Sequence, residues 1–407
     1  MTDWILAHPA LVVAGLKTVL LLFLLLTAIA YTVWFERKVL AHIQSRWGPY
    51  RVGPHGLLQP LADGLKFLFK EDINLGGVTS RFVYLLAPFL SLTLALLAIA
   101  VIPFGPEEIP LPWLGTSTGL YLADIPISLL FVLAVTSLGV YGVALAGWAS
   151  NSKYPLLGGL RSAAQMVSYE LALTVSVVGV LLLANTLSLR ELVLSQTGTW
   201  GGILPRWHVF PQFVAFLCFF IAGVAETNRL PFDLPEAETE LVAGFHTEYS
   251  SFKFAMFFLA EYAHIITLSL LVAILFLGGW LSPFPPTPLW QWTHSLPVFL
   301  GAGLGLLVLL DGFRLPQLTH RAISFLLGLL LLALSGLLLA FPPVLASIQA
   351  PFWLLGKAGL FVFLFIWTRG TLPRFRYDQL MAFGWKFLLP LAVLNVLVTS
   401  FCLALPD

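Results

Sequence analysis

Charge is scarce in this sequence of 407 residues. Lysine, arginine, aspartate and glutamate make up only 10% of the chain, whereas hydrophobic residues make up 59%. Soluble globular domains contain about 25% charged and about 45–50% apolar residues. The mean hydropathy is +0.92, and so much apolar surface cannot be hidden in one water-soluble core. The composition therefore indicates a membrane protein, and the net charge of +1 gives no sign of nucleic-acid binding.

The sequence also lacks the common motifs for binding metals, clusters and nucleotides. It has two cysteines, Cys218 and Cys402, in separate apolar segments, whereas an iron–sulfur cluster needs about four thiolates. We expect both cysteines to be small buried apolar residues. No histidine pair has metal-binding spacing, and no glycine-rich loop precedes Lys-Ser or Lys-Thr. The chain alone is therefore predicted to bind no metal ion and no nucleotide.

Long apolar runs are what the sequence does contain. A run of about 18 apolar residues is long enough to cross a bilayer as a helix. The sequence therefore predicts an all-α integral membrane protein with about ten transmembrane helices, in a single membrane domain covering 1–407. The ten predicted spans are 10–34, 82–104, 125–149, 162–185, 208–226, 252–280, 297–313, 322–345, 352–368 and 386–404.

Basic residues lie mainly on one side of these spans. When the connections are numbered alternately, starting outside, 17 of the 21 lysines and arginines fall in inside loops and two in outside loops. Cytoplasmic loops of membrane proteins carry such an excess of positive charge. The alternation therefore supports an even number of spans with both termini outside. Lys17 and Lys357 lie within spans, where their long stems can reach the interface, and we expect no role for them.

The first inside loop, 35–81, is the longest and most basic. Within it, Leu57–Lys70 has leucines at three- and four-residue steps and polar residues on the opposite face. This pattern predicts an amphipathic helix lying in the headgroup plane. The preceding segment, 46–56, contains too many glycines and prolines for a regular helix. Because it also contains the bulky Trp47 and Tyr50, we expect a structured loop against a partner protein; the alternative is a solvated basic loop.

Carboxylates are concentrated in the third inside loop and the start of the next span. Clustered carboxylates repel one another, so some are expected to exchange protons near neutral pH as a coupled group. Alternatively, the segment is a solvated acidic loop that docks onto a basic partner surface. Seven of the chain's twenty acidic residues lie here: Glu226, Asp233, Glu236, Glu238, Glu240, Glu248 and Glu261.

Two acidic residues lie deep within predicted spans. Glu170 and Glu261 are nine to ten residues from the inside ends of their spans, roughly 13 Å deep at the rise of an α-helix. A carboxylate at this depth costs on the order of 3 kcal/mol, so it usually faces a polar cavity. His264 follows Glu261 on the same helix face. These positions predict a proton path; the alternative is that each acid is only hydrogen-bonded within the bundle.

Four inside segments resemble the inside loops of the H subunit of respiratory complex I, in the same order along the chain. The similarity is specific because each segment combines several charged and aromatic residues with glycine and proline at fixed positions, and it covers about 1–281 and 351–407. The segments are Glu36–Leu40, Gln44–Pro49 and Arg51–Asp63; Gly147–Tyr154, Leu160–Ser162 and Ser168–Glu170; Glu226–Arg229, Pro231–Glu238 and His246–Ser250; and Arg374–Leu380.

The resemblance implies that quinone is the substrate and that it binds between this chain and two peripheral subunits. One of these holds the terminal iron–sulfur cluster, and FMN belongs to other partners, so the chain is not catalytic alone. Small membrane subunits and lipids would be its further partners, in the inner membrane of a bacterial cell. By position, the quinone-binding residues would be Arg37, Gln44, Arg46, Ala62, Asp63 and Phe232. The acidic proton path would comprise Glu170, Glu226, Arg229, Asp233, Glu236, Glu238, Glu240, Glu248 and Glu261.

One segment departs from the family pattern. Members usually run from Trp280 directly to the span that begins near Pro351, whereas here 282–350 intervenes with two more apolar stretches. We expect an inserted helical hairpin at the periphery of the conserved bundle. Two other classes remain as alternatives: a related proton-pumping hydrogenase or ferredoxin:quinone oxidoreductase, and a stand-alone cation transporter, for which partner-binding loops would be unnecessary. The electron donor and the type of quinone stay open.

Overall fold

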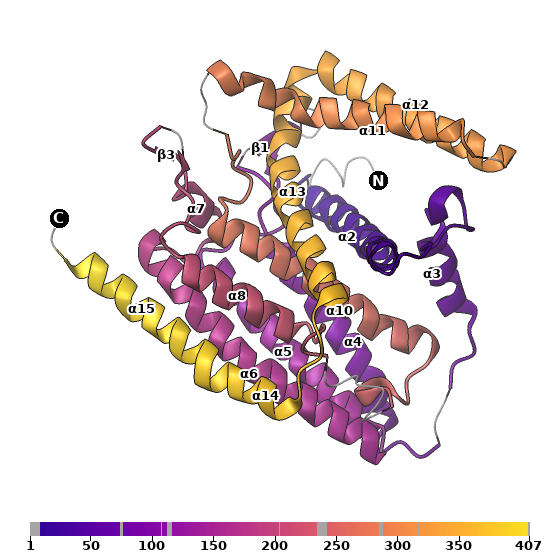
Figure 1. Ribbon diagram of the computed structural model, residues 1–407, viewed down its shortest axis with the longest axis vertical. Helices are drawn as coiled ribbons and strands as arrows, with labels where there is room; N and C mark the ends of the chain where they lie inside the picture. The colour runs from indigo at the N-terminus through magenta and orange to yellow at the C-terminus, as the bar shows by residue number, and fades with distance from the viewer. Residues whose placement is uncertain are drawn as a thin grey trace.

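The computed structural model describes residues 9–73, 76–106, 108–111, 116–202, 204–233, 242–284, 288–315 and 317–405, and helices dominate it (Figure 1). Within this part of the chain, nine helical segments are long and apolar enough to cross a membrane. They are α2 (Pro9–Ile43), α4 (Arg81–Ala98) with η2 (Ile99–Val101), α5 (Ser128–Ala149), α6 (Lys153–Ala184), α10 (Ser251–Phe276), η4 (Pro288–Ser295) with α11 (Leu296–Gly312), α12 (Leu318–Ala340), α13 (Pro342–Thr371), and α14 (Tyr377–Phe383) with η5 (Gly384–Leu388) and α15 (Leu389–Ala404).

The tenth predicted span contains the shorter apolar helix α8 (Phe213–Glu226). Together these helices confirm the prediction of an all-α membrane protein with about ten spans. The predicted surface helix is also confirmed, as α3 (Gln59–Phe69), whose residues are all at least partly exposed. The remaining elements are short: η1 (Pro54–Gly56), α7 (Leu189–Leu194), η3 (Gly244–His246), and the strand pairs β1 (Glu108–Leu111) with β2 (Thr116–Gly119) and β3 (Thr199–Trp200) with β4 (Leu204–Pro205).

Several helix boundaries differ from the sequence prediction for reasons of packing. Helix α6 begins nine residues before the predicted start at 162 and includes Gly158 and Gly159. A Cβ atom on Gly158 would lie 2.8 Å from the backbone of Gly244, and one on Gly159 would lie 3.1 Å from Cα of Gly147. These glycines therefore allow close helix contact rather than interrupting the helix. Conversely, α8 begins five residues later than predicted, after the turn that contains Pro211.

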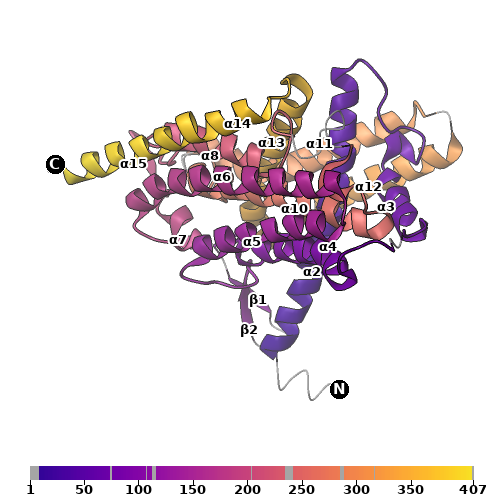
Figure 2. The same ribbon diagram turned by 90° about the horizontal axis from the view of Figure 1, so that it is seen from below.

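The helices α4, α5, α6, α8 and α10 pack side by side around the main hydrophobic core (Figure 1). Helix α2 crosses them steeply in the second view and reaches α10 and α13 (Figure 2). Contacts between loops agree with the predicted sidedness. On the outside, Nζ of Lys17 donates to the carbonyl of Gly119 at 2.7 Å; on the inside, Lys253 pairs with Asp72 at 3.1 Å.

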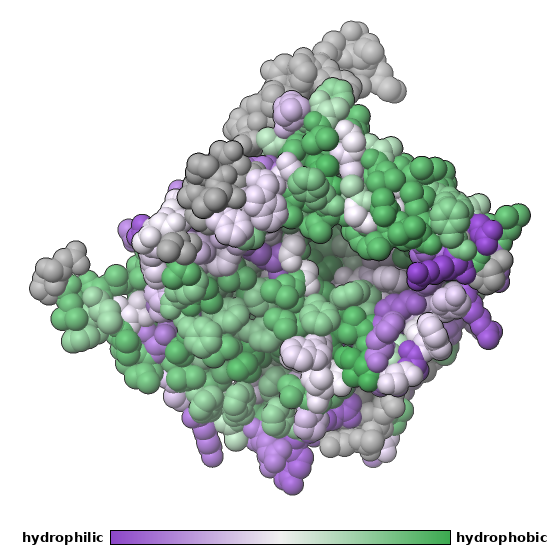
Figure 3. All heavy atoms as spheres, turned by 45° about the horizontal axis from the view of Figure 1, so that its top comes forward, coloured by the Kyte–Doolittle hydropathy of each residue, from purple (hydrophilic) through white to green (hydrophobic). Residues whose placement is uncertain are grey.

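Helices α11 and α12 lie next to each other along the upper edge of Figure 1 and pack mainly against one another. Their closest approach is at Gly305 and Gly328, where a Cβ atom on Gly328 would lie 2.9 Å from the carbonyl oxygen of Gly305. The pair also contacts α13 and η1. Its outer surface is rich in exposed leucine, and apolar residues cover much of the molecular face in Figure 3.

Two expectations about single residues are wrong. Lys357 does not extend to the interface: its Nζ donates to the carbonyls of Leu277, Gly279 and Leu281 at 2.6, 2.8 and 2.6 Å. It therefore satisfies carbonyls just beyond the end of α10 that no helical N–H can reach. Cys218 is buried as expected, but Cys402 is exposed because it lies on a face of α15 that no other described element covers.

Candidate functional site

A buried carboxylate, Glu36, organises a polar cluster between α2, α10 and α13. It is only 3% exposed, and its Oε1 lies 3.0 Å from Nη1 of Arg229. Arg369 on α13 also pairs with Oε1, and the hydroxyl of Tyr262 donates to Oε2 at 2.7 Å. Each carboxylate oxygen of Glu36 thus accepts a charge-assisted hydrogen bond, the arrangement that a buried ion requires.

Arg229 connects Glu36 to Glu261. Its Nε lies 2.7 Å from Oε1 of Glu261, and its guanidinium lies over the ring of Tyr262, with 4.4 Å between Cζ and the ring centroid. The chain turns at Asn228, whose positive φ of 50° ends α8 and directs Arg229 back toward the bundle. Two carboxylates, Glu36 and Glu261, are therefore balanced by Arg229 and Arg369. Removal of one member of such a buried set typically costs about 3–5 kcal/mol.

Glu226 and Glu170 extend the polar set toward α5 and α6. Glu226 is 4% exposed, and its Oε1 lies 3.0 Å from Nε2 of His264. Glu170 accepts a hydrogen bond from the hydroxyl of Ser137 on α5. Both Glu226 and His264 act electrostatically on Glu170. The predicted alignment of His264 with Glu261 thus brings the imidazole to a third carboxylate, Glu226, which adjoins Glu170.

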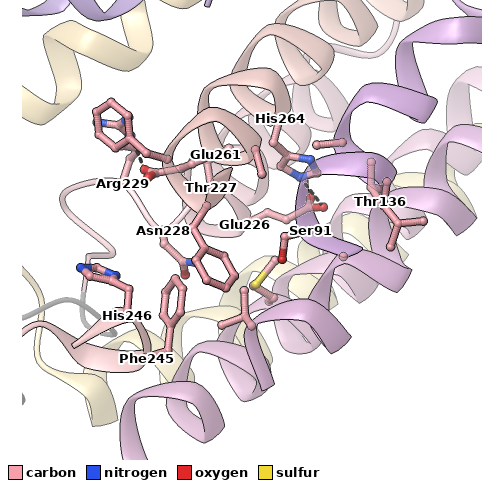
Figure 4. Close-up of a pocket in the computed structure, with 18 of the residues that line it drawn as sticks. Ser91, Thr136, Glu226, Thr227, Asn228, Arg229, Phe245, His246, Glu261 and His264 are labelled. Carbon is pink, nitrogen blue, oxygen red and sulfur yellow. Dashed lines mark hydrogen bonds and ion pairs between the residues drawn. The ribbon is translucent and has the colours of Figure 1, made fainter. Parts of the chain in front are cut away.

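A cavity of about 180 Å³ lies beside these groups (Figure 4). Its polar lining includes Glu226, Arg229, Glu261 and His264, which enter it from α8, the following turn and α10. His246 lines the opposite side, and burial lowers its pKa to about 4. His246 is therefore neutral at physiological pH. A cavity of this size with several polar groups can hold hydrogen-bonded water, which is the usual medium for proton transfer between separated acids.

The other predicted acidic residues lie at the edge of this cluster or apart from it. Asp233 lines the cavity and pairs with Arg374 at 3.0 Å. Glu248 is partly exposed and does not line the cavity; its carbonyl accepts a hydrogen bond from Tyr84. Glu236, Glu238 and Glu240 lie outside the described residues.

The predicted quinone-binding residues occupy the first inside loop and its surroundings. Nη1 of Arg37 lies 2.7 Å from Oδ2 of Asp63, which joins α2 to α3. The side chain of Arg46 donates to Gln44 at 2.6 Å, and Ala62 is partly exposed on α3. Phe232 is separate from this group: it is buried and stacks on Phe375, with 5.6 Å between ring centroids.

Sequence reasoning missed Glu36 and Arg369 as members of the site. Because the first span was predicted to end at 34, Glu36 was placed in the basic loop, whereas α2 continues to Ile43. The available signal was a single carboxylate directly after a long apolar run and before two basic residues. Arg369 was assigned only to the inside excess of positive charge. Among the described residues, no group of three His, Cys, Asp or Glu side chains is arranged to bind a metal ion.

The fold and the cluster define a multi-pass membrane protein with ionisable groups buried between its helices. The family model described as NADH dehydrogenase matches residues 16–400. The first of two H subunits of NADH-quinone oxidoreductase from Solibacter usitatus (strain Ellin6076) is 51% identical over 392 residues, 95% of this chain and 96% of the relative. The second H subunit of the same enzyme from Koribacter versatilis (strain Ellin345) is 50% identical over 406 residues, 97% and 98% of the two chains.

A third relative, the H subunit of NADH-quinone oxidoreductase from Thermomicrobium roseum (strain ATCC 27502 / DSM 5159 / P-2), is 46% identical over 401 residues. That alignment spans 98% of this chain and 97% of the relative. The chain therefore belongs to the H-subunit family of NADH-quinone oxidoreductases. The resemblance inferred from the four inside segments is confirmed.

Proposed function

We propose that this chain forms the membrane wall of the quinone-binding chamber in a proton-translocating NADH:quinone oxidoreductase. In this role it couples quinone reduction to proton movement through its buried acidic cluster. Membership of the H-subunit family makes the chain part of an oxidoreductase complex. Quinone, the iron–sulfur clusters and FMN would then be supplied or held with partner subunits, in the inner membrane of a bacterial cell.

One observation supports this proposal above all: polar contacts run without interruption from the first inside loop to the internal cavity. Asp63 pairs with Arg37, and the adjacent residue of α2, Glu36, pairs with Arg229. Arg229 in turn pairs with Glu261 at the cavity. A charge that forms on quinone near Arg37 and Asp63 acts on the next carboxylate of this series, because low-dielectric surroundings strengthen such interactions.

In this proposal the two predicted residue groups have different tasks. Arg37, Gln44, Arg46, Ala62 and Asp63 border the quinone entrance, while Phe232 closes the lower chamber from behind by stacking on Phe375. The carboxylates take up and release protons as the charge on quinone changes. The path comprises Glu170, Glu226, Asp233, Glu236, Glu238, Glu240, Glu248 and Glu261, with Arg229 between them.

The exposed aromatic residues of the first loop fit contact with partners. Trp47 and Phe69 are each 85% exposed in the isolated chain. Large aromatic residues with this exposure favour protein–protein or membrane contacts. We propose that Trp47 faces a peripheral subunit, whereas Phe69 on the amphipathic helix α3 lies at the lipid headgroups.

The decisive experiment replaces Glu226 with glutamine in the assembled complex in proteoliposomes. Glutamine retains an acceptor for His264, whose Nε2 lies 3.0 Å away, but it cannot carry a proton. We expect slower NADH:quinone activity and a lower proton-to-electron ratio. Glu191→Gln is the matched control, because Glu191 is an exposed carboxylate on α7, outside the cluster. Normal pumping in an assembled Glu226→Gln complex would overturn the proposal.

A further inference from the structure

A contact between distant segments joins the first inside loop to the α11–α12 pair. Nε2 of His55, in η1, lies 2.6 Å from Oδ2 of Asp311 in the last turn of α11. A carboxylate can only accept, so the imidazole N–H donates in either charge state of the ring. The two residues are 256 positions apart in the sequence, and α12 also packs against η1.

The backbone of the loop is shaped to present His55. Gly53, His55 and Gly56 have positive φ values of 72°, 50° and 76°. A Cβ atom on Gly56 would lie 2.4 Å from the carbonyl oxygen of Pro49, so the loop folds tightly on itself. Left-handed backbone is uncommon for a residue other than glycine, although histidine is among those that adopt it more readily. The surroundings therefore hold His55 in this conformation.

The loop also contacts α2 next to Arg37. The ring of Tyr50 packs edge-on against His55, with 5.6 Å between centroids. On its other side, Nζ of Lys38 lies 5.8 Å from the centroid of Tyr50. Asp311, His55, Tyr50 and Lys38 thus form a continuous series that ends beside the pair of Arg37 and Asp63. A shift of the hairpin is transmitted to the residues that border the proposed quinone entrance.

Asp311 is unusual within the hairpin segment. It is the only acidic residue between 282 and 350, and it stands at the C-terminal end of α11, where the helix dipole disfavours negative charge. Helix stability therefore does not account for it, whereas the contact with His55 does. The rest of the pair is apolar: Leu307 on α11 and Leu326 on α12 are 62% and 72% exposed. Figure 3 shows a recess between the upper apolar part of the molecule and its lower body, with hydrophilic residues at one end.

We propose that the α11–α12 hairpin is a side wall of the quinone portal, held against the first inside loop by the Asp311–His55 latch. The hairpin offers an apolar surface to the isoprenoid tail, while the latch positions the loop that borders the headgroup path. This inference rests on the proposed function. Asp311 and His55 are positioning residues, so their effect falls on the binding of long-tailed quinone rather than on the chemical step.

The test measures kcat and KM of the assembled complex with a short-tailed and a long-tailed quinone. The variants are Asp311→Ala, His55→Asn and the reciprocal swap of His55→Asp with Asp311→His; asparagine and aspartate both accept left-handed backbone. Because the pair is partly exposed, we expect each single variant to raise KM for the long-tailed quinone about threefold. KM for the short-tailed quinone and both kcat values stay unchanged, and the swap restores KM.

Two further variants separate the latch from other effects. Gly328→Leu forces α11 and α12 apart, because a Cβ atom there would already lie 2.6 Å from Cγ of Leu309, and it should reproduce the Asp311→Ala result. Unchanged KM in the single variants, or a loss for both quinones that the swap does not restore, overturns the inference. Asp63→Asn, measured in parallel, tests the proposed function itself: normal quinone reduction in that variant removes the function, whatever the latch variants show.

Discussion

Replacing Glu261 with glutamine separates the charge of this carboxylate from its shape. Oε1 of Glu261 lies 2.7 Å from Nε of Arg229, and the amide oxygen of glutamine can accept the same hydrogen bond. A hydrogen bond to a charged acceptor contributes about 1.5–3 kcal/mol and a neutral one about 0.5–1.5 kcal/mol, so the expected loss is about 1 kcal/mol. This is well below the cost of removing a buried partner altogether, and the complex should still assemble.

Glu170→Gln is expected to be milder still for stability. Glu170 is hydrogen-bonded to the hydroxyl of Ser137, and within the described part of the chain it forms no ion pair with a basic residue, so glutamine leaves no basic group without its partner. For proton transfer the two replacements should be equally severe, because neither amide can release a proton. Both variants should therefore lose proton pumping and reduce quinone more slowly.

The assay uses purified complex in proteoliposomes, with NADH oxidation and internal acidification recorded together. Thermal inactivation of the same preparations measures stability, and Glu191→Gln again controls for loss of a carboxylate elsewhere. If Glu170→Gln and Glu261→Gln assemble and pump at the normal proton-to-electron ratio, both acids are structural and the proposed path is refuted. Loss of assembly in Glu261→Gln would contradict the estimate of its small structural cost.

Three further predictions concern other parts of the chain. Asp63→Asn removes the charge that pairs with Arg37 at 2.7 Å; it should weaken quinone reduction while reduction of hydrophilic acceptors by the peripheral subunits is unchanged, and equal loss of both would indicate failed assembly. Lys357→Met leaves three carbonyls without their donor and should lower stability by about 3 kcal/mol, measured as faster thermal inactivation, with unchanged stability as the contrary result. Burial lowers the pKa of His246 from 6.5 to about 4, so the folded state binds fewer protons than the unfolded state and stability should fall as pH drops from 6.5 to 4, by up to about 3 kcal/mol. His246→Phe should flatten this dependence, and an unchanged dependence in thermal inactivation would contradict the assignment.

The span positions were predictable because a bilayer imposes a minimum length and an apolar composition on each helix. The limits of the helices were not, because they depend on neighbours. Helix α2 continues through Glu36, whose charge is compensated by Arg229 and Arg369. Gly158 appeared to be a helix breaker, yet within α6 it allows the close approach of Gly244.

The candidate site was predictable in composition rather than in connection. The carboxylates of the third inside loop and the two intramembrane acids were identifiable from the sequence, since charge at such depth is costly and therefore informative. Their partners come from helices far apart in the chain: Ser137 approaches Glu170 from α5, and Glu36 reaches Arg229 across 193 positions. Such pairings depend on how the helices cross, which no local pattern contains.

The sequence alone determined that this is a helical membrane protein, how its loops are divided between two sides, and the family to which its inside loops belong. These properties follow from hydropathy, from the placement of positive charge and from short motifs, all of which are local. Packing decided which charges meet, where the cavity lies beside Glu226, and that Asp311 reaches His55. Burial makes these contacts necessary, because an ion withdrawn from water must find its partner within the protein.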